Sequence, residues 1–274
     1  MSKAFLSLLL AISLTASAAN ADVKEGVFAN AKQLIVTGWL GRLRIEPDTQ
    51  PGIHVRLEGP KETLDAIVMQ EQSGVLRING LSNPGGSVSV INTTNAGASN
   101  SISSVTIGAN VYSNIVISGP DGSLSTVIGG NNGDIETVVQ VPEEATVIIE
   151  QALGDITVGD THGPVKIDMS AGNAKLGMIG NAELRVDGTG SINARRVVGD
   201  LTVQVQGTGK VEVADAELDQ LTVAVEGTGK VIVGGQAQRA DLAVQGVGRI
   251  EVVAVVERPR LSVQGLGRIE VGNW

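Results

Sequence analysis

The chain has 274 residues, a formal net charge of −9 and no cysteine. The missing cysteines exclude disulfides, thiol nucleophiles and cysteine-ligated zinc, and the acidic balance argues against nucleic acid or an anionic membrane surface as partner. The hydrophobic fraction of 42% is typical of a globular protein, but with two Trp, one Tyr and two Phe the core has to consist of Val, Ile, Leu and Ala.

The first residues have the pattern of a secretory signal peptide. A basic residue is followed by an apolar run over 4–14 and by the small residues Ala-Asn-Ala at 19–21, an A-x-A cleavage pattern; 16–18 forms a second such pattern. The apolar run is shorter than the roughly 20 residues of a membrane-spanning helix, and no later segment is apolar enough to span. We therefore expect a signal peptide over 1–21 and an exported mature chain over 22–274, in the periplasm, at the cell surface or outside the cell.

Short alternating stretches follow, which are typical of strands that bury one face. They are LIVTGWLGRLRI (34–45), GIHVRLEG (52–59), SGVLRING (73–80) and SNIVISGP (113–120). PKETLDAI (60–67) is the one segment with a helical pattern. Residues 81–101 are rich in Ser, Asn and Gly and predict a long loop or insertion.

The C-terminal third is a repeat. Each copy consists of a Leu-x-Val run, a Gly-x-Gly or a close variant, and a second alternating run. The first glycines of the five clear copies lie 19 or 20 residues apart, at Gly188, Gly207, Gly227, Gly246 and Gly265. Weaker copies precede them at 129–138, 150–158 and 166–176, and in the last of these Gly172 and Ala174 are assigned to the Gly-x-Gly position.

This period predicts an all-β fold, a right-handed parallel β-helix (β-solenoid) with rungs of about 19–20 residues. One repeat cannot bury its Val face alone, whereas rungs stacked about 4.8 Å apart form a continuous apolar column. Val211, Val231, Ile250 and Ile269 are expected to stack inside the coil. A β-sandwich is the alternative, and it explains the alternation but not near-identical repeats at this spacing. A single β-helix domain over 22–274 is therefore predicted.

In their order, these segments resemble the auto-transporter adhesin, head GIN domain family of bacterial envelope proteins. The resemblance begins at KQLIVTGWLGRLRIEPDTQPGIHVRLEG (32–59), continues through SGVLRING (73–80) and ends with the repeats. It implies a right-handed β-helix, export and an adhesin role. The family supplies no catalytic motif, so the resemblance transfers no functional residue to this chain.

A column of basic residues is the most specific candidate for a binding surface. The residue after the Gly-x-Gly is basic in four successive copies, at Lys210, Lys230, Arg249 and Arg268. Lys175 and Ser191 are expected to continue this column upstream, and Glu212, Glu251 and Glu270 lie two positions further on in their copies. One hypothesis is a stripe that grips an acidic glycan or a protein partner. The other, which the small energies of exposed ion pairs favour, is a self-neutralising outer face.

Upstream, the same column turns acidic at Asp155 and Asp134, which are expected to be near neighbours. Paired carboxylates can catalyse sugar hydrolysis or bind Ca²⁺, but solvated acid is the simpler account in a chain of this charge. Asp155 and Lys210 are expected three rungs apart, about 14 Å, which is too far for one to assist the other. No catalytic residue, metal or cofactor is predicted.

These observations favour a non-enzymatic envelope protein that presents an elongated surface for adhesion or scaffolding. The alternatives are a carbohydrate-active β-helix enzyme acting on acidic polysaccharide, by fold analogy, and a periplasmic accessory module in envelope signalling. The expected partner is an envelope protein or glycan. At the end of the last rung, either Trp274 folds over the opening or this end docks onto another chain and forms an oligomer.

Overall fold

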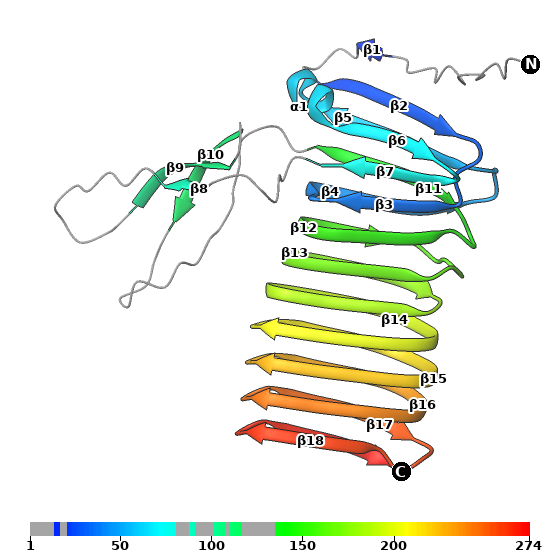
Figure 1. Ribbon diagram of the computed structural model, residues 1–274, viewed down its shortest axis with the longest axis vertical. Helices are drawn as coiled ribbons and strands as arrows, with labels where there is room; N and C mark the ends of the chain where they lie inside the picture. The colour runs from blue at the N-terminus through cyan, green and yellow to red at the C-terminus, as the bar shows by residue number, and fades with distance from the viewer. Residues whose placement is uncertain (1–13, 17–20, 81–87, 91–100, 108–109, 117–134) are drawn as a thin grey trace, which may run out of the picture.

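The computed structural model describes residues 14–16, 21–80, 88–90, 101–107, 110–116 and 135–274. The strands of these residues form one 16-stranded sheet, wound into a coil, and a separate 3-stranded antiparallel sheet (Figure 1). The first elements are β1 (Leu14–Ala16), β2 (Asp22–Phe28), β3 (Gln33–Thr37), β4 (Leu40–Asp48), β5 (Ile53–Gly59), α1 (Lys61–Ala66), β6 (Val68–Gln72), β7 (Val75–Asn79), β8 (Val88–Val90), β9 (Ser101–Ile107) and β10 (Asn110–Val116).

The remaining elements build most of the coil. They are β11 (Glu136–Pro142), β12 (Thr146–Val158), β13 (Val165–Ile179), β14 (Ala182–Gly207), β15 (Lys210–Gly227), β16 (Lys230–Gly246), β17 (Arg249–Val255), β18 (Arg260–Gly265) and β19 (Arg268–Asn273). From β12 to β19 every pairing between neighbouring strands is parallel. The predicted parallel β-helix is therefore confirmed.

Each C-terminal repeat makes one turn of this coil. The Leu-x-Val run lies on one face, the chain turns at the Gly-x-Gly, and the second run follows on the other face (Figure 1). Gly227 illustrates why the corner needs glycine: its φ is +114°, and an added Cβ would lie 2.7 Å from the carbonyl oxygen of Gly207 in the rung above. Only a residue without a side chain allows rungs to approach so closely at positive φ.

The core is the stack of inward-facing Val, Ile and Leu side chains. Val211 pairs with Val231, Val231 with Ile250, and Ile250 with Ile269. The first three are fully buried, and Ile269 in the last rung is partly buried against the same cluster. The predicted inward column is therefore confirmed.

The N-terminal segment contributes strands of its own to the stack. β3 and β4 pair in parallel with β12, with Leu34 beside Val147 and Gly41 beside Gly154. The alternating stretch at 34–45 is thus a rung that stacks directly on the copy at 150–158. β4 also pairs with β11, so it separates β11 from β12 in the sheet order.

The N-terminal end of the coil is closed by a change of strand direction and a short helix. β5 runs antiparallel to β11, and β2 runs antiparallel to β5. α1 confirms the predicted helical segment and contacts β2 and β5 at this end (Figure 1). The ammonium of Lys24 donates to the carbonyl oxygens of Leu64 (2.9 Å) and Ile67 (2.8 Å), which satisfies carbonyl groups at the end of the helix.

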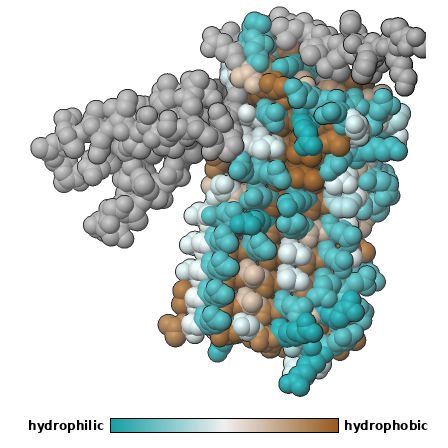
Figure 2. All heavy atoms as spheres, viewed as in Figure 1, coloured by the Kyte–Doolittle hydropathy of each residue, from teal (hydrophilic) through white to brown (hydrophobic). Residues whose placement is uncertain are grey.

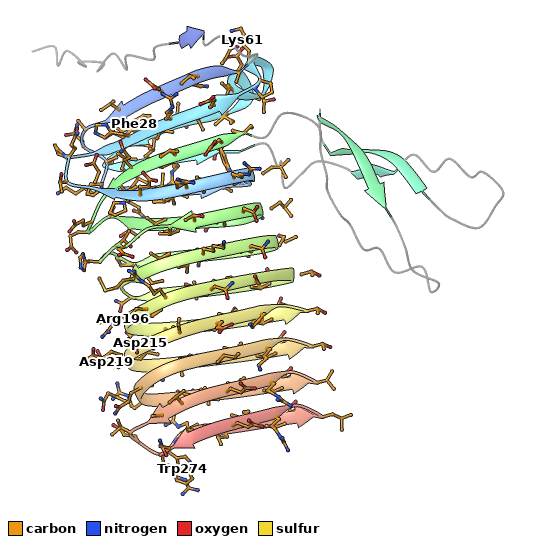
Figure 3. All side chains as sticks on the ribbon, turned by 180° about the vertical axis from the view of Figure 1, so that it is seen from behind. Phe28, Lys61, Arg196, Asp215, Asp219 and Trp274 are labelled. Carbon is orange, nitrogen blue, oxygen red and sulfur yellow. The ribbon has the colours of Figure 1, made fainter. Side chains whose placement is uncertain are left out.

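The C-terminal end has no such cover in the described structure. The side chain of Trp274 is 68% exposed and points away from the last rung (Figure 3). The expectation that Trp274 folds over the opening is wrong. The reason is that β19 stays paired with β17 as far as Asn273, which holds the backbone at the edge of the rung and leaves the Trp274 side chain in solvent.

The separate sheet stands beside the coil and consists of β8, β9 and β10 (Figure 1). β8 and the first residue of β9 fall within the predicted insertion at 81–101. The other parts of that insertion, 81–87 and 91–100, lie outside the described residues, as does most of the predicted signal peptide, of which the structure describes β1 and residue 21.

We expect Val231→Asp to lower the free energy of unfolding by about 3 to 5 kcal/mol, because it buries an unpaired carboxylate in the middle of the stack. Ile232→Asp is the matched control: Ile232 faces outward between Glu212 and Glu251, so its replacement should cost at most about 1 kcal/mol. Urea denaturation followed by circular dichroism measures both. Equal losses for the two variants would show that the inward and outward positions are wrongly assigned.

Candidate binding surface

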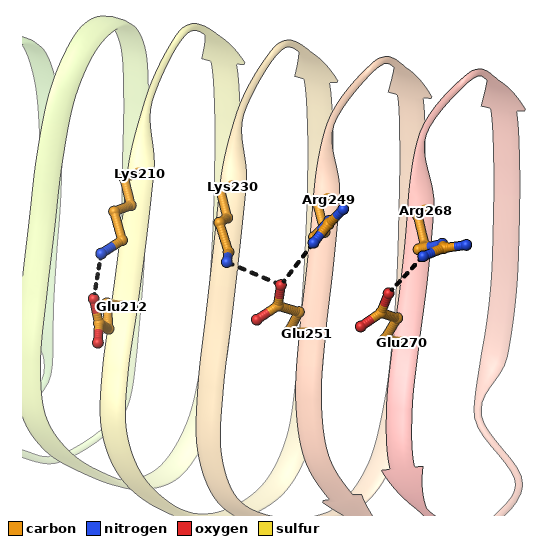
Figure 4. A network of polar contacts seen from close by, with 7 residues as sticks. All are labelled: Lys210, Glu212, Lys230, Arg249, Glu251, Arg268 and Glu270. Carbon is orange, nitrogen blue, oxygen red and sulfur yellow. Dashed lines mark hydrogen bonds and ion pairs between the residues drawn. The ribbon is translucent and has the colours of Figure 1, made fainter.

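The four basic residues predicted from the repeat lie in one column. Lys210 pairs with Lys230, Lys230 with Arg249, and Arg249 with Arg268, so each lies one rung from the next. Figure 4 shows the four side chains in a row on successive strands, just after the corner. The parallel register produces this row, because it places equivalent residues of the repeat directly above one another.

Carboxylates in the neighbouring column neutralise these cations. Lys210 contacts Glu212 at 2.5 Å, Lys230 contacts Glu251 at 2.9 Å, and Arg268 contacts Glu270 at 3.2 Å. Glu251 also accepts from Arg249 at 3.5 Å. Lys230, and after it Arg249, lower the pKa of Glu251 through these hydrogen bonds and their charge. The column is therefore a ladder of ion pairs rather than a bare basic stripe.

Upstream, the column is polar and uncharged for two rungs and then becomes acidic. Lys210 pairs with Ser191, Ser191 with Asn173, and Asn173 with Asp155. The Ser191 hydroxyl donates to the Asn173 side-chain oxygen at 3.0 Å, and the Asn173 amide donates to Asp155 at 3.3 Å. Asp155 and Lys210 are thus three rungs apart, as the repeat predicts.

Two upstream assignments made from the sequence are wrong. Lys175 pairs with Asn193 and so lies in the column of Glu212, and Gly172 pairs with Gly190, the second glycine of its Gly-x-Gly. The cause is the corner of β13, which has a single glycine that aligns with the second glycine of β14 and not with the first, so the assignment is displaced by two residues. The register also shifts by one residue between Met169 and Ala171. Ala174, also assigned to the Gly-x-Gly, is instead a core residue opposite Ile192.

The expected pair of Asp134 and Asp155 stays a prediction, because Asp134 lies outside the described residues. Glu136, two residues later, pairs with Arg42, and Arg42 pairs with Asp155. The N-terminal strand β4 therefore lies between β11 and β12. The sequence could not reveal this, because β4 precedes both copies in the chain by about a hundred residues.

A shallow groove of about 400 Å³ lies along the corner beside the column. Its floor is the backbone of the corner glycines, and its polar side chains are Asn173, Thr189, Ser191, Thr208 and Lys210. The groove offers hydroxyls, an amide and one ammonium in a line across three rungs. Such groups can hydrogen-bond to a polar polymer but do not converge on one reacting atom.

The face formed by the Leu-x-Val runs carries a cluster that the sequence reasoning missed. Asp168 pairs with Arg185, which donates to Asp187 at 2.7 Å and to Gln204 and Gln206 at 3.4 Å each. Partial burial, and then the negative charges of Asp187 and Glu150, raise the pKa of Asp168. Only the register shows that these residues, from three different rungs, share one patch.

The second corner of the coil carries further ion pairs. Arg196 contacts Asp215 at 2.9 Å and Glu217 at 3.0 Å, and Figure 3 labels Arg196 and Asp215 at this corner. These residues line an open depression of about 480 Å³. Arg195 also forms an ion pair with Asp160, which lies two rungs away, at 2.6 Å. The backbone N–H of Met178, and after it Arg195, lower the pKa of Asp160. The separation of 35 residues in the last pair, close to two repeat periods, is a signal the sequence did contain.

In the described part of the chain, no three His, Cys, Asp or Glu side chains converge as ligands for a metal ion. Within the same residues, the structure has no helix that is both long and apolar enough to cross a membrane.

The opposite pKa shifts of Asp168 and Asp160 predict opposite effects on stability. Because the folded pKa of Asp168 lies above its unfolded value, its charge costs stability at neutral pH, and this cost disappears as the pH falls through the folded pKa to below about 4. We expect Asp168→Asn to stabilise the chain at pH 7 by about 1 kcal/mol or less, since the group is only partly buried. At pH 3 the gain should be absent.

Asp160→Asn is the control with the opposite sign. Its folded pKa is lowered, so its carboxylate stabilises the folded chain above about pH 4, and this contribution is lost as the pH falls through the folded pKa. We expect this variant to melt at a lower temperature than the parent at pH 7. Thermal melts at pH 7 and pH 3 measure both variants, and a lower melting temperature for Asp168→Asn at pH 7 would contradict this electrostatic account.

Two solved structures resemble the coil. One is described as a "putative adhesin" from Bacteroides fragilis, with a TM-score of 0.54, 14% identity, and coverage of 91% of this chain and 96% of that one. The other is described as a "putative lipid binding protein" from Parabacteroides distasonis, with a TM-score of 0.56, 14% identity, and coverage of 92% and 96%. At this identity they support the fold alone. A comparison with curated protein sequences finds no match.

A family model covers most of the coil. The family described as "Putative auto-transporter adhesin, head GIN domain" matches residues 43–237 and again 198–273. The two overlapping matches start at β4 and end at β19, so they span the stacked rungs whose register and core are described above. This chain belongs to the auto-transporter adhesin, head GIN domain family.

Proposed function

We propose that this chain is a non-enzymatic, exported protein of the cell envelope, whose elongated β-helix surface binds a partner in adhesion or scaffolding. The observation that carries the proposal is the periodicity of the outer face. Chemically similar side chains recur one rung apart from Lys210 to Arg268, beside a polar groove along the corner. Membership of an adhesin family supports this role and supports a location at the surface or outside the cell.

The partner that fits this surface best is an extended polar polymer, such as an envelope glycan with acidic groups. Each exposed ion pair in the column stabilises the fold by about 1 kcal/mol or less, so a bound carboxylate can replace a glutamate at small cost. A polymer that repeats its groups can make many such weak contacts together, which raises the overall affinity. An envelope protein is the second candidate, as part of a scaffold or of a signalling module.

The geometry gives less support to a carbohydrate-active enzyme. Glycoside hydrolysis requires two carboxyl groups about 5 to 10 Å apart across the scissile bond. Along the basic column each nearby acid, Glu212, Glu251 and Glu270, is ion-paired with a Lys or Arg. Asp155 accepts from Asn173 and lies opposite Arg42. These carboxylates pair with neighbouring side chains on the outer face, and they do not surround a common point where a glycosidic bond could lie.

Replacing the column with serines should weaken retention on envelope material. We expect the combined variant Lys210→Ser, Lys230→Ser, Arg249→Ser and Arg268→Ser to bind isolated envelope polysaccharide at least tenfold more weakly than the parent, measured by sedimentation with the polymer at two salt concentrations. The control removes four ion-paired bases elsewhere on the coil, at Arg56, Lys61, Lys166 and Arg195. Equal losses in both variants would show that net charge, and not this column, governs binding.

Incubation with acidic polysaccharides should leave the polymers intact, with or without Ca²⁺. We expect no new reducing or unsaturated ends, and no stoichiometric Ca²⁺ uptake at millimolar concentration in a calorimetric titration. Tight uptake that Asp155→Asn abolishes, together with polymer cleavage, would revive the enzyme hypothesis. In that case a substitution of Asn173 would be the next test, because its side-chain amide donates to the Asp155 carboxylate.

A further inference from the structure

The last rung exposes the side chains that earlier rungs bury. Leu261 and Val263 are 52% and 46% exposed, although their partners in the rung above, Leu242 and Val244, are 2% and 0% exposed. Leu266, at the corner, is 88% exposed. Figure 2, a side view, shows apolar and polar side chains alternating in columns along the coil, with apolar side chains reaching the C-terminal end at the bottom of the view. The core of the solenoid therefore opens directly onto solvent at the C-terminal end.

The backbone is open at the same place. Among the described strands β18 pairs only with β16, and β19 pairs only with β17, so both have a free edge on the side away from the coil. A free edge carries unpaired N–H and C=O groups and is a template for another strand. At the other end of the molecule, α1 contacts β2 and β5, and the outermost described strands, β1 and β6, run antiparallel to their neighbours β2 and β7. The two ends thus differ in strand direction: among the described strands, only the C-terminal end leaves free edges on strands that are paired in parallel.

We propose that a second copy of this chain covers the C-terminal end, so that two coils join end to end around a two-fold axis. The two-fold axis is perpendicular to the long axis of the coil and passes through both of its faces. It therefore pairs β18 with β18 of the second copy, and β19 with β19 of the second copy, and both pairs are antiparallel. The apolar columns of the two copies then become continuous. Such an interface is isologous, because the same surface serves both copies. This inference does not depend on the function proposed above.

The charges of β19 select a register for this pairing. When Ile269 lies opposite Ile269 of the second copy, Ile269 and Val271 stay on the core side and each Arg268 faces a Glu270 of the second copy. A register centred on Glu270 would instead set two carboxylates opposite each other, which is destabilising. Arg268 and Glu270 already contact each other within one chain at 3.2 Å. The dimer would join two such pairs into one cluster of four charges.

A lipid surface fits this end less well than a second copy. Lipid tails cannot hydrogen-bond to the free backbone groups of β18 and β19, which would remain unsatisfied in the bilayer. Two of the bases near the opening are also engaged by acids: Arg260 contacts Asp241 at 3.5 Å, and Arg268 contacts Glu270 at 3.2 Å. Vesicle binding is therefore an outcome that the experiment separates from dimerisation.

The test is the mass of the purified chain by sedimentation equilibrium. We expect twice the monomer mass at micromolar concentration, and the monomer mass for the double variant Leu261→Glu, Val263→Glu. The matched control is Val27→Glu, Val68→Glu, since Val27 and Val68 are 56% and 44% exposed near the other end. This control should remain dimeric, and circular dichroism checks that both variants fold. A monomeric parent, or a dimer that only the control disrupts, would overturn the proposal.

A charge exchange tests the register without changing the core. We expect Arg268→Glu and Glu270→Arg each to weaken dimerisation at least tenfold, and the double exchange to restore it. Because the natural chain has no cysteine, Ile269→Cys offers a second test. Residues directly opposite in antiparallel strands have Cα atoms about 4.5 to 5.5 Å apart, within the range of a disulfide. Oxidation should therefore link two copies.

The cysteine control is Thr49→Cys, in an exposed turn after β4. It should stay unlinked under the same oxidation. No effect of the two single charge reversals, linkage through Thr49→Cys but not through Ile269→Cys, or binding to phosphatidylglycerol vesicles by a chain that remains monomeric would each overturn this arrangement.

Discussion

Each rung of this coil can bury its apolar side chains only against the rungs above and below it. A single Leu-x-Val run leaves one face bare, and only an in-register copy one strand spacing away covers it. That requirement fixes the stack from Val211 to Ile269, and it fixes the outer columns at the same time, because inward and outward residues alternate. The row of bases and its carboxylates therefore follow from the packing of the core.

Where the repeat is regular, the sequence predicted the positions of individual side chains correctly. The burial of Val231 and the row from Lys210 to Arg268 both follow from copies 19 or 20 residues apart. It failed where a corner has only one glycine, as before Lys175, since aligning Gly172 with the first glycine of the next copy instead of the second displaces the following side chains by two residues. It also could not place β4 between β11 and β12, because pairing between distant segments leaves no trace in local periodicity.

The same regularity limits what chemistry the surface can perform. A repeated rung places like groups in rows, whereas catalysis requires unlike groups gathered around one point. The clusters that do join unlike groups contain Arg185 with Asp187 and Arg195 with Asp160. They form where corners or runs of different rungs meet, and there these acids accept hydrogen bonds from the arginines. A surface of this kind suits binding along its length, through many weak contacts to an extended partner.

A coil built from self-complementary rungs has no internal reason to stop, because the edge of every rung fits the next. Stopping requires a strand that accepts the edge but does not present a parallel edge of the same kind. At the N-terminal end, β5 does this by running antiparallel to β11, and β2 and α1 then cover it. The exposed edges of β18 and β19 face the same problem. An antiparallel strand from a second copy would end the stack in the way that β5 ends it at the opposite end.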